Sequence, residues 1–176
     1  CENPETIMGT KISIITLPAC PTYTKANGGP GSISEQIAVS GVDVVLGGGS
    51  KHFAFTAEGS TQSVLEVAQG NGFFTIDSVA KLNNAPGEQK LLGLFSDSTM
   101  PVRLQGEAGR EAEKPRPSWA NLVSPYLGSV ELPAIMGCEP NPDFAAMPTL
   151  KQMTEAALQR LENPQGFFLM VESASI

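Results

Sequence analysis

One carboxylate stands where a metal ion could bind. Glu172 directly follows an apolar run, residues 167–171, that has the composition of a buried strand. In an open α/β sheet, ligands bind just beyond the carboxyl ends of the strands, so a carboxylate at this point could take part in such a site. The residues that complete such a site should follow Ile176, and we therefore expect this sequence to contain only part of it.

The residue types for a zinc centre are scarce. A hydrolytic zinc site takes about three protein ligands, most often histidines, and leaves one position open. The chain has one histidine, His52, which comes shortly after three consecutive glycines, and we interpret it as a surface residue. No self-contained dinuclear zinc centre is expected.

Two polar segments could carry other chemistry. Ser96 follows the apolar run 91–95, but no Gly-x-Ser-x-Gly elbow surrounds it, which favours a turn or helix cap over a nucleophile. The glycine-rich segment 47–51 lacks the spacing of a phosphate-binding loop and indicates a tight turn. Asp43, near the start of a predicted strand, is expected to face solvent or to pair with a neighbouring loop. A non-catalytic α/β module that binds an anion near residues 47–50 is the alternative function.

These side chains need elements to position them, and the best marked is a helix near the end of the sequence. Thr149 and Gln152 have the spacing of a capping box, and apolar residues recur at helical intervals from 150 to 161. A turn at 163–166 ends this helix. The run 167–171 then follows, and we predict it to be a buried strand.

Similar patterns alternate along the rest of the chain. The sequence predicts helices at 32–40, 63–69 and 78–82, and strands at 11–17, 42–46, 73–76 and 91–95. This alternation predicts an α/β fold with a mostly parallel sheet and flanking helices. Prolines, glycines and mixed charges mark 97–147 as a long irregular insertion, for which a lid, a dimer contact and a solvated loop all stay open.

Composition and charge narrow the class of protein. With 176 residues, 41% of them hydrophobic, the chain can bury one sizeable core, so a single domain spanning 1–176 is predicted. The formal net charge of -7 disfavours binding to nucleic acids or anionic membrane surfaces, which require clustered lysines and arginines. The apolar stretches are shorter than the roughly 20 residues that a membrane span needs.

Several stretches resemble bacterial alkaline phosphatases, and they occur in the same order as in that family. Residues 149–154, followed by 166–172 and 174–176, are similar to the segment just before the family's Asp-x-x-x-His zinc motif. Further similarity is found at 31–36, 42–49, 91–97 and 100–103, and it weakens only between 107 and 136. The resemblance therefore spans nearly the whole chain.

The resemblance implies an interior fragment of the alkaline phosphatase fold, lying between the family's substrate-binding arginine and its first zinc-ligating aspartate. That family hydrolyses phosphate monoesters through a phosphoserine, with two zinc ions and one magnesium ion. Glu172 matches the magnesium-ligating glutamate, although Ser173 stands where the family has glycine. The nucleophile, the arginine and the zinc ligands lie outside these residues. We therefore expect the chain alone to be inactive and to bind neither zinc nor magnesium tightly.

The resemblance also implies roles for the three cysteines. The matching family cysteines are paired, which predicts a disulfide between Cys1 and Cys20. Cys138 is predicted to be a free thiol, because its family partner lies beyond Ile176. The parent protein would be periplasmic or secreted. Sheet edges left open by missing strands are expected to favour self-association into a homo-oligomer.

Overall fold

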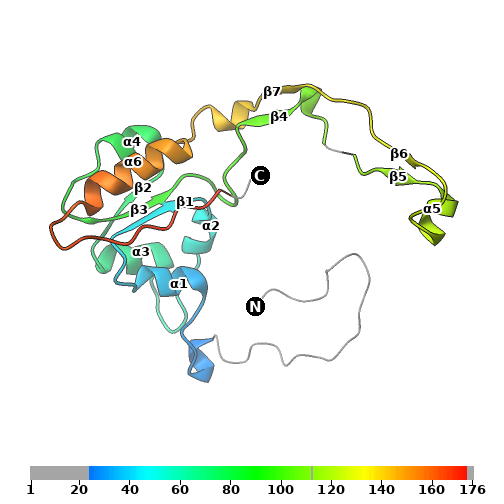
Figure 1. Cartoon of the computed structure of the whole chain (residues 1–176). Helices are drawn as coiled ribbons and strands as arrows, with labels where there is room; N and C mark the ends of the chain where they lie inside the picture. The colour runs from blue at the N-terminus through cyan, green and yellow to red at the C-terminus, as the bar shows by residue number, and fades with distance from the viewer. Residues whose placement is uncertain (1–23, 112, 174–176) are drawn as a thin grey trace. The chain divides into compact units, whose positions relative to one another are not determined.

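The chain divides into two compact units in the computed structural model, which describes residues 24–111 and 113–173 (Figure 1). The first, called the α/β unit, contains the described residues up to Thr99 together with Pro148–Val171. The second, called the arm unit, contains Met100–Met147 and Glu172 onward. The single domain expected from the sequence stays a prediction.

A three-stranded parallel sheet with the order β1-β3-β2 forms the centre of the α/β unit. Leu92 of the middle strand pairs with Val45 on one side and with Thr75 on the other. The strands are β1 (Val44–Gly47), β2 (Phe73–Ile76) and β3 (Lys90–Leu94). Parallel strands need crossover connections, and helices supply them here, as the alternating pattern of the sequence predicted.

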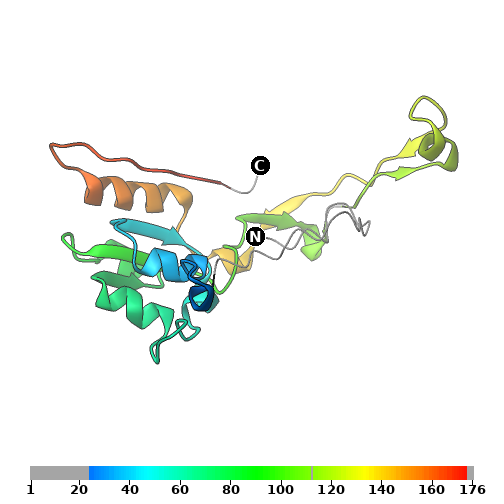
Figure 2. The same cartoon turned by 90° about the horizontal axis from the view of Figure 1, so that it is seen from below.

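Helices cover both faces of this sheet. Figure 2 shows α1 and α3 on one side of it and α6, in orange, on the other. The helical elements of the unit are η2 (Lys25–Asn27), α1 (Ile33–Ala38), α2 (Ser50–Phe53), α3 (Val64–Gly70), α4 (Val79–Asn83) and α6 (Leu150–Leu161). The main apolar core consists of Ala38, Phe53, Ala57, Val64, Ala68, Phe73, Leu92 and Leu94. The α/β fold with a parallel sheet and flanking helices is therefore confirmed.

Capping boxes begin three of these helices, and the sequence predicted the boxes of α1 and α6. In each box the N-cap hydroxyl accepts a hydrogen bond from the amide three residues on, and that residue's side chain accepts one from the N-cap amide. The pairs are Ser32–Glu35 in α1, Ser63–Glu66 in α3 and Thr149–Gln152 in α6. The helices and strands predicted between 32 and 95 agree with the structure to within two residues at each end. The strand predicted at 11–17 lies outside the described residues.

The middle strand has no room for a side chain at Gly93. A Cβ atom there would lie 2.7 Å from Cδ2 of Leu46 and 2.7 Å from Cζ of Phe95. Because protein interiors are close-packed, such short contacts would force the neighbours to move. The side chains of Leu46 and Phe95 therefore use the space that the glycine leaves.

The prediction of a buried strand at 167–171 is wrong. The structure has no strand there, and Phe168 and Met170 are 88% and 76% exposed. An apolar run becomes a stable strand only when a neighbouring strand supplies backbone hydrogen bonds and cross-strand packing. None of the described strands pairs with this run, because the sheet consists of β1, β3 and β2 alone.

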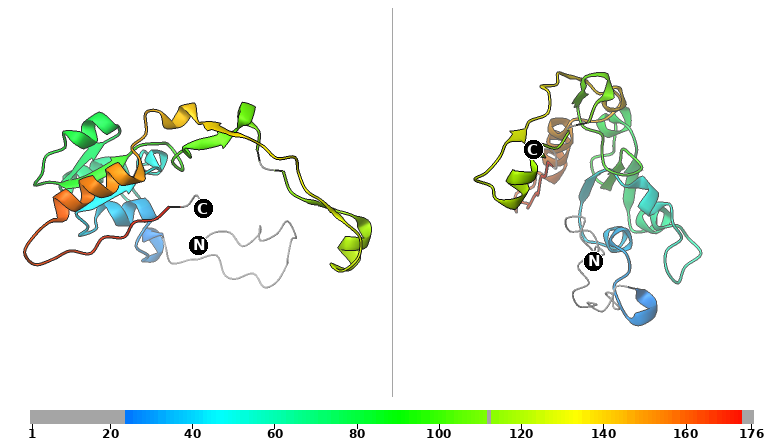
Figure 3. Two further views of the ribbon diagram at one scale, coloured as in Figure 1. Left: turned by 45° about the horizontal axis from the view of Figure 1, so that its top comes forward. Right: turned by 90° about the vertical axis from the view of Figure 1, so that its right-hand side faces the viewer.

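The arm unit is built from short antiparallel pairs, as Figure 3 shows. Strand β4 (Leu104–Gly106) pairs with β7 (Cys138–Pro140), and β5 (Arg116–Pro117) pairs with β6 (Val130–Glu131). The remaining elements are η3 (Glu107–Gly109), α5 (Trp119–Val123) and η4 (Pro142–Phe144). No residue that the structure describes between 100 and 147 is buried, so this unit has no apolar core of its own.

The helices in the described part of the chain were compared with the requirements for crossing a membrane. None of the helices there combines the length and the apolar character that crossing a bilayer requires.

Candidate functional site

The glycine-rich turn after β1 packs against the segment that follows β3, at the carboxyl ends of both strands. The amides of Gly49 and Ser50 donate to the carbonyl oxygen of Ser96 at 2.9 and 3.0 Å, and the Lys51 amide donates to the carbonyl of Asp97 at 3.3 Å. Gly49 has a φ of +92°, which favours glycine. The turn predicted for 47–51 is present at Gly49, and Ser50 and Lys51 already belong to α2. These three amides are already paired with carbonyls, so they are not free to bind a phosphate.

The polar side chains at this edge also pair with one another. The Ser50 hydroxyl donates to Oδ1 of Asp97 at 2.8 Å, and the Lys51 ammonium donates to the Ser98 hydroxyl at 3.2 Å. The Ser96 hydroxyl donates to the carbonyl of Ser98 at 3.0 Å. A nucleophilic serine needs a base to accept its proton, and a backbone carbonyl cannot serve as one. The interpretation of 96–98 as a turn is confirmed.

Two side chains that the sequence assigned to the surface lie there. His52, in the short helix α2, is exposed. Asp43 is also exposed, and its backbone carbonyl accepts a hydrogen bond from the Leu91 amide at 2.8 Å. Both predictions are confirmed, and neither residue is part of a cluster of ligands.

Glu172 is exposed and follows the unpaired run 167–171. Among residues 24–111 and 113–173, no group of three or more histidine, cysteine, aspartate or glutamate side chains is placed to hold a metal ion. These residues therefore do not by themselves fit the zinc and magnesium centre that the resemblance implies, and no catalytic step through a metal follows from them. The role of Glu172 stays a prediction.

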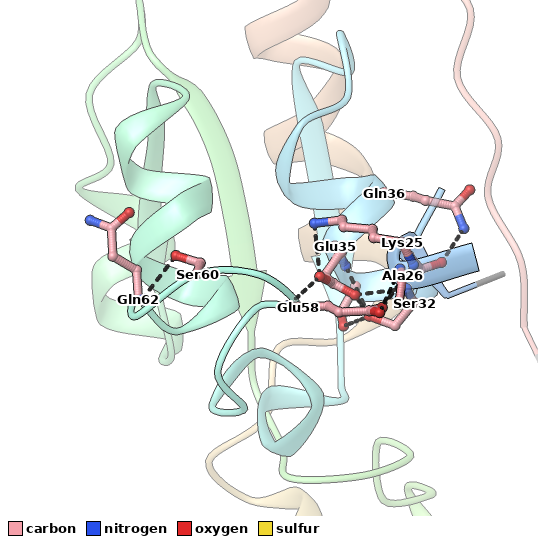
Figure 4. Close-up of polar contacts among 10 residues, drawn as sticks. Lys25, Ala26, Ser32, Glu35, Gln36, Glu58, Ser60 and Gln62 are labelled. Atoms are coloured by element: carbon pink, nitrogen blue, oxygen red, sulfur yellow. Dashed lines mark hydrogen bonds and ion pairs between the residues drawn. The ribbon is translucent and has the colours of Figure 1, made fainter. Parts of the chain in front are cut away.

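Four residues form a hydrogen-bonded polar group that we call the Glu35 cluster: Lys25, Ser32, Glu35 and Glu58 (Figure 4). Glu35 belongs to α1, and the residue is only 6% exposed. Its Oε1 contacts the Lys25 ammonium at 2.9 Å and accepts from the Glu58 amide at 2.8 Å. Its Oε2 accepts from the Ser32 amide and hydroxyl at 2.8 and 2.9 Å. Both oxygens of a buried carboxylate are thereby satisfied.

The charge of Glu35 is strongly stabilised by this arrangement. The Lys25 ammonium is the main cause that lowers the pKa of Glu35 from 4.5 to about 2, against the opposing effect of burial. The Ser32 and Glu58 amides lower the pKa further. The carboxylate of Glu58 in turn accepts from the amides of Lys25 and Ala26, both at 2.8 Å. The cluster fastens the 3-10 turn η2 to α1 and to the loop before α3, and it leaves no oxygen of Glu35 for a ligand.

Sequence reasoning identified only one part of this cluster. The spacing of Ser32 and Glu35 predicted their capping box. The contributions of Lys25 and Glu58 come from residues 10 positions before and 23 positions after Glu35, and no local pattern marks them.

Helix α6 is held by a second set of long-range hydrogen bonds that the sequence did not predict. The Arg160 guanidinium donates to the carbonyls of Ala85, Pro86 and Gln89, in the loop between α4 and β3. Burial lowers the pKa of Arg160. These bonds satisfy carbonyls of a loop that leads directly into the central strand, so the role of Arg160 is structural.

Of the three cysteines, Cys138 lies within the part of the chain that the structure describes. Cys138, in β7, is exposed and unpaired within the part of the chain that the structure describes, which agrees with the free thiol expected there. Cys1 and Cys20 lie outside the described residues, and their disulfide stays a prediction.

Comparisons with known proteins identify the family. The family model for alkaline phosphatase matches residues 15–176. The alkaline phosphatase of Escherichia coli (strain K12) is 40% identical over 165 residues, which cover 89% of this chain and 32% of that protein. Alkaline phosphatase H of Pseudomonas aeruginosa is 38% identical, with 89% and 31% covered. The streptomycin-6-phosphate phosphatase of Streptomyces griseus is 32% identical, with 90% and 34% covered.

Among solved structures, the crystal structure of Thermus thermophilus alkaline phosphatase matches with a TM-score of 0.42 at 22% identity, covering 73% of this chain and 20% of that one. The chain spans about a third of the length of the curated relatives that it matches. The family match covers almost the whole of its 176 residues. This chain belongs to the alkaline phosphatase family.

Proposed function

We propose that this chain is a structural segment of a larger alkaline phosphatase, a phosphate monoester hydrolase, and that it has no turnover of its own. The observation that carries the proposal is the family match over 15–176, combined with coverage of only 31–34% of the relatives' length. The printed names of these relatives describe phosphatases, and phosphate monoesters are the substrates that we assign to the parent protein.

The proposed inactivity follows from the roles that the polar side chains already have. The Ser96 hydroxyl donates to a backbone carbonyl, which cannot act as its base, and the Ser50 hydroxyl donates to the Asp97 carboxylate at the exposed edge of the sheet. In the parent, two zinc ions and one magnesium ion would supply Lewis-acid chemistry at the phosphate. We assign to Glu172 one oxygen ligand of that magnesium ion, with the other ligands supplied by sequence outside this chain.

The cellular location that we propose for the parent protein follows from the same resemblance. A periplasmic or secreted location would allow the Cys1–Cys20 disulfide to form and persist. Homo-oligomer formation is also proposed, because β1 and β2 are both edge strands of the described sheet and edge strands invite pairing.

An assay of the purified chain with p-nitrophenyl phosphate, in excess zinc and magnesium, tests the first part of the proposal. No turnover above the buffer rate is expected. Turnover that disappears in Ser96→Ala or Ser50→Ala, but not in the exposed control Ser60→Ala, would contradict it.

Calorimetry with magnesium tests the assignment of Glu172. The chain alone should show no saturable binding, because one carboxylate cannot replace the waters of the ion. In the complete parent protein, Glu172→Gln should lose magnesium affinity by roughly 10-fold or more, whereas the exposed control Glu162→Gln should not. Micromolar binding by the chain alone that is lost in Glu172→Ala would overturn the assignment.

The alternative function, a non-catalytic anion-binding module near residues 47–50, has less support. The three amides that would face an anion donate instead to the carbonyls of Ser96 and Asp97. Titration with inorganic phosphate checks this alternative, since a saturable signal that is lost in Lys51→Ala would favour it over the phosphatase segment.

A further inference from the structure

The sequence contains two Asn-Gly pairs, Asn27-Gly28 at the end of η2 and Asn71-Gly72 just after α3. In such a pair the backbone nitrogen of the glycine can attack the side-chain carbonyl carbon, Cγ, of the asparagine. Glycine favours this attack, because it has no side chain to shield the nitrogen and it permits many backbone conformations. Both asparagines are exposed, and the two glycines have φ values of +78° and +91°. The two sites therefore have the same reacting groups, and the surrounding structure distinguishes them.

The reaction is a deamidation, and water is its only co-reactant. Hydroxide removes the proton of the Gly28 amide, and the nitrogen then forms a bond to Cγ of Asn27. The bond between Cγ and Nδ2 breaks, and the departing nitrogen takes a proton from water and leaves as ammonia. The product is a five-membered succinimide ring. Water opens this ring at either carbonyl carbon, which gives aspartate or isoaspartate without any oxidation or reduction.

The structure holds Asn71-Gly72 firmly. The Asn71 side chain donates to the carbonyl of Val67 at 2.8 Å, and the Gly72 amide donates to the carbonyl of Gln69 at 3.0 Å. Both bonds must break before the nitrogen can reach Cγ. The next residue, Phe73, is the first residue of β2 and is only 3% exposed in the apolar core. Reaction at Asn71 therefore requires opening of the end of α3 and of the adjoining strand.

Asn27-Gly28 is held much less firmly. Asn27 is the last residue of η2, a 3-10 turn without any buried residue. The Gly28 amide donates to the carbonyl of Lys25 at 2.9 Å, and the Asn27 amide donates to that of Thr24 at 3.1 Å. Hydrogen bonds in 3-10 turns have poor geometry, and local opening costs least where few apolar contacts are buried. Opening of this single turn brings the Gly28 nitrogen to Asn27 without disturbing the core.

We propose that Asn27 is a site of spontaneous deamidation in the folded chain and that Asn71 is protected. The Glu35 cluster controls the rate at Asn27. The Glu58 carboxylate accepts from the amides of Lys25 and Ala26, immediately before Asn27, both at 2.8 Å (Figure 4). These two bonds hold the turn closed, so release of Glu58 speeds the reaction.

Deamidation at Asn27 in turn weakens the Glu35 cluster. Isoaspartate adds one carbon atom to the main chain of the turn that brings the Lys25 ammonium to within 2.9 Å of Glu35. Either product also adds a negative charge to a turn that already binds the Glu58 carboxylate. A buried carboxylate that loses its partner is strongly destabilising, so the modified chain unfolds at a lower urea concentration.

Tryptic peptide mapping measures the two sites separately. Residues 26–51 and 52–81 form two tryptic peptides, and each contains a single asparagine, Asn27 or Asn71. The full chain is aged in mildly alkaline buffer, and mass spectrometry follows conversion of the amide to the acid. Asn27 should react about 10-fold or more faster than Asn71, because opening free energies rise from near zero in exposed turns to the global value in the core. In urea that unfolds the chain, the two rates should become similar.

Three results of this measurement would overturn the proposal. They are equal rates at Asn27 and Asn71 in the folded chain, a faster reaction at Asn71, and a rate difference that persists in urea. The last result would show that the local sequence, and not the structure, determines which asparagine reacts.

Variants of Glu58 test the control by the cluster. Glu58→Ala should speed the reaction at Asn27 about three-fold or more, because the turn loses two hydrogen bonds to a carboxylate, and the rate at Asn71 should not change. Glu58→Gln keeps one acceptor oxygen and should have a smaller effect. The matched control Glu88→Ala removes an exposed carboxylate elsewhere and should change neither rate. An unchanged rate at Asn27 in Glu58→Ala, or equal acceleration at both asparagines, would overturn this control.

Urea denaturation of fresh and aged chains tests the consequence for stability. The wild-type chain should show a lower urea midpoint after ageing. Asn27→Gln should keep its midpoint, because attack on a glutamine side chain would form a larger and less favourable ring. An equal loss of midpoint in Asn27→Gln, or no loss in a wild-type chain that has deamidated at Asn27, would overturn the link to the Glu35 cluster.

Discussion

The α/β unit and the arm unit are stabilised in different ways. In the α/β unit, Leu91 and Leu92 are completely buried in a parallel strand that helices cover on both faces. In the arm unit no described residue between 100 and 147 is buried, and its strand pairs are only two or three residues long. Apolar burial therefore determines the first unit, whereas local hydrogen bonds and glycine conformations determine the second. Substitutions of the same type should have very different effects in the two units.

The largest difference should come from truncating a leucine in each unit. Leu92→Ala should lower the free energy of unfolding by about 2–5 kcal/mol, because it leaves a cavity in the middle of the core. Leu104→Ala, in the exposed strand β4, should change it by less than about 0.5 kcal/mol. Urea denaturation followed by far-UV circular dichroism measures both values. Equal losses would mean that the arm unit also depends on buried apolar contacts.

The next difference concerns carboxylates in ion pairs. Glu35→Gln should cost about 2 kcal/mol, since it removes the charge that Lys25 and three hydrogen bonds stabilise inside the α/β unit. Glu113 contacts Arg116 at 3.3 Å in the arm unit, but both side chains are largely exposed, so Glu113→Gln should have almost no effect. Urea denaturation measures the free energy of unfolding of both variants. A loss in Glu113→Gln as large as that in Glu35→Gln would show that the exposed ion pair of the arm unit matters as much as the buried one.

The pH dependence of stability sharpens this test. The pKa of Glu35 is about 2 in the folded chain and should return to about 4.5 on unfolding. As the pH falls, the Glu35 carboxylate of the unfolded state therefore binds a proton before that of the folded state does. Its stabilisation is therefore complete above pH 4.5 and is lost as the pH falls toward 2. Denaturation curves from pH 7 to 2.5 should show this decline in the wild-type chain, and Glu35→Gln should have a flatter profile. Parallel profiles for the two proteins would show that the Glu35 charge is not coupled to folding.

The smallest difference concerns helix caps. Thr149→Ala removes the capping box of α6 and should cost about 1 kcal/mol. Ser118 stands at the N-cap of α5, but its hydroxyl makes no cap bond and accepts from the Ser129 amide instead. Ser118→Ala should therefore leave global unfolding unchanged and raise the hydrogen-exchange rate of the Ser129 amide. Protection of that amide in Ser118→Ala would contradict this description of the loop between β5 and β6.

The same contrast explains how much the sequence could predict. The helices and strands that were predicted between 32 and 95 agree with the structure to within two residues, because burial on a helical or strand face imposes a periodic pattern on neighbouring residues. The one-turn helix α2 is too short to impose such a pattern and was not predicted. The capping boxes at Ser32 and Thr149 are likewise local signals. The arm unit has no buried face, so its short strands left no periodic pattern, and 97–147 could be predicted only as an irregular insertion.

Errors and omissions arose where structure depends on distant residues. The run 167–171 has the composition of a strand but lacks a pairing strand in the described chain, and composition cannot reveal a missing neighbour. The contacts of Arg160 with the loop at 85–89 and of Glu58 with η2 join residues that are far apart in sequence. Glu172 was identified only because it matches a family motif, and among the described residues it belongs to no group of three or more possible metal ligands.

Gly93 also has a consequence for how this sheet can change during evolution. Leu46 on β1 and Phe95 after β3 occupy the volume that any larger residue at this position would need. A relative that replaces the glycine with alanine should therefore carry a smaller side chain at one of those two neighbours. The three positions are expected to vary as a linked set, and sequences that break this linkage should mark a displaced middle strand.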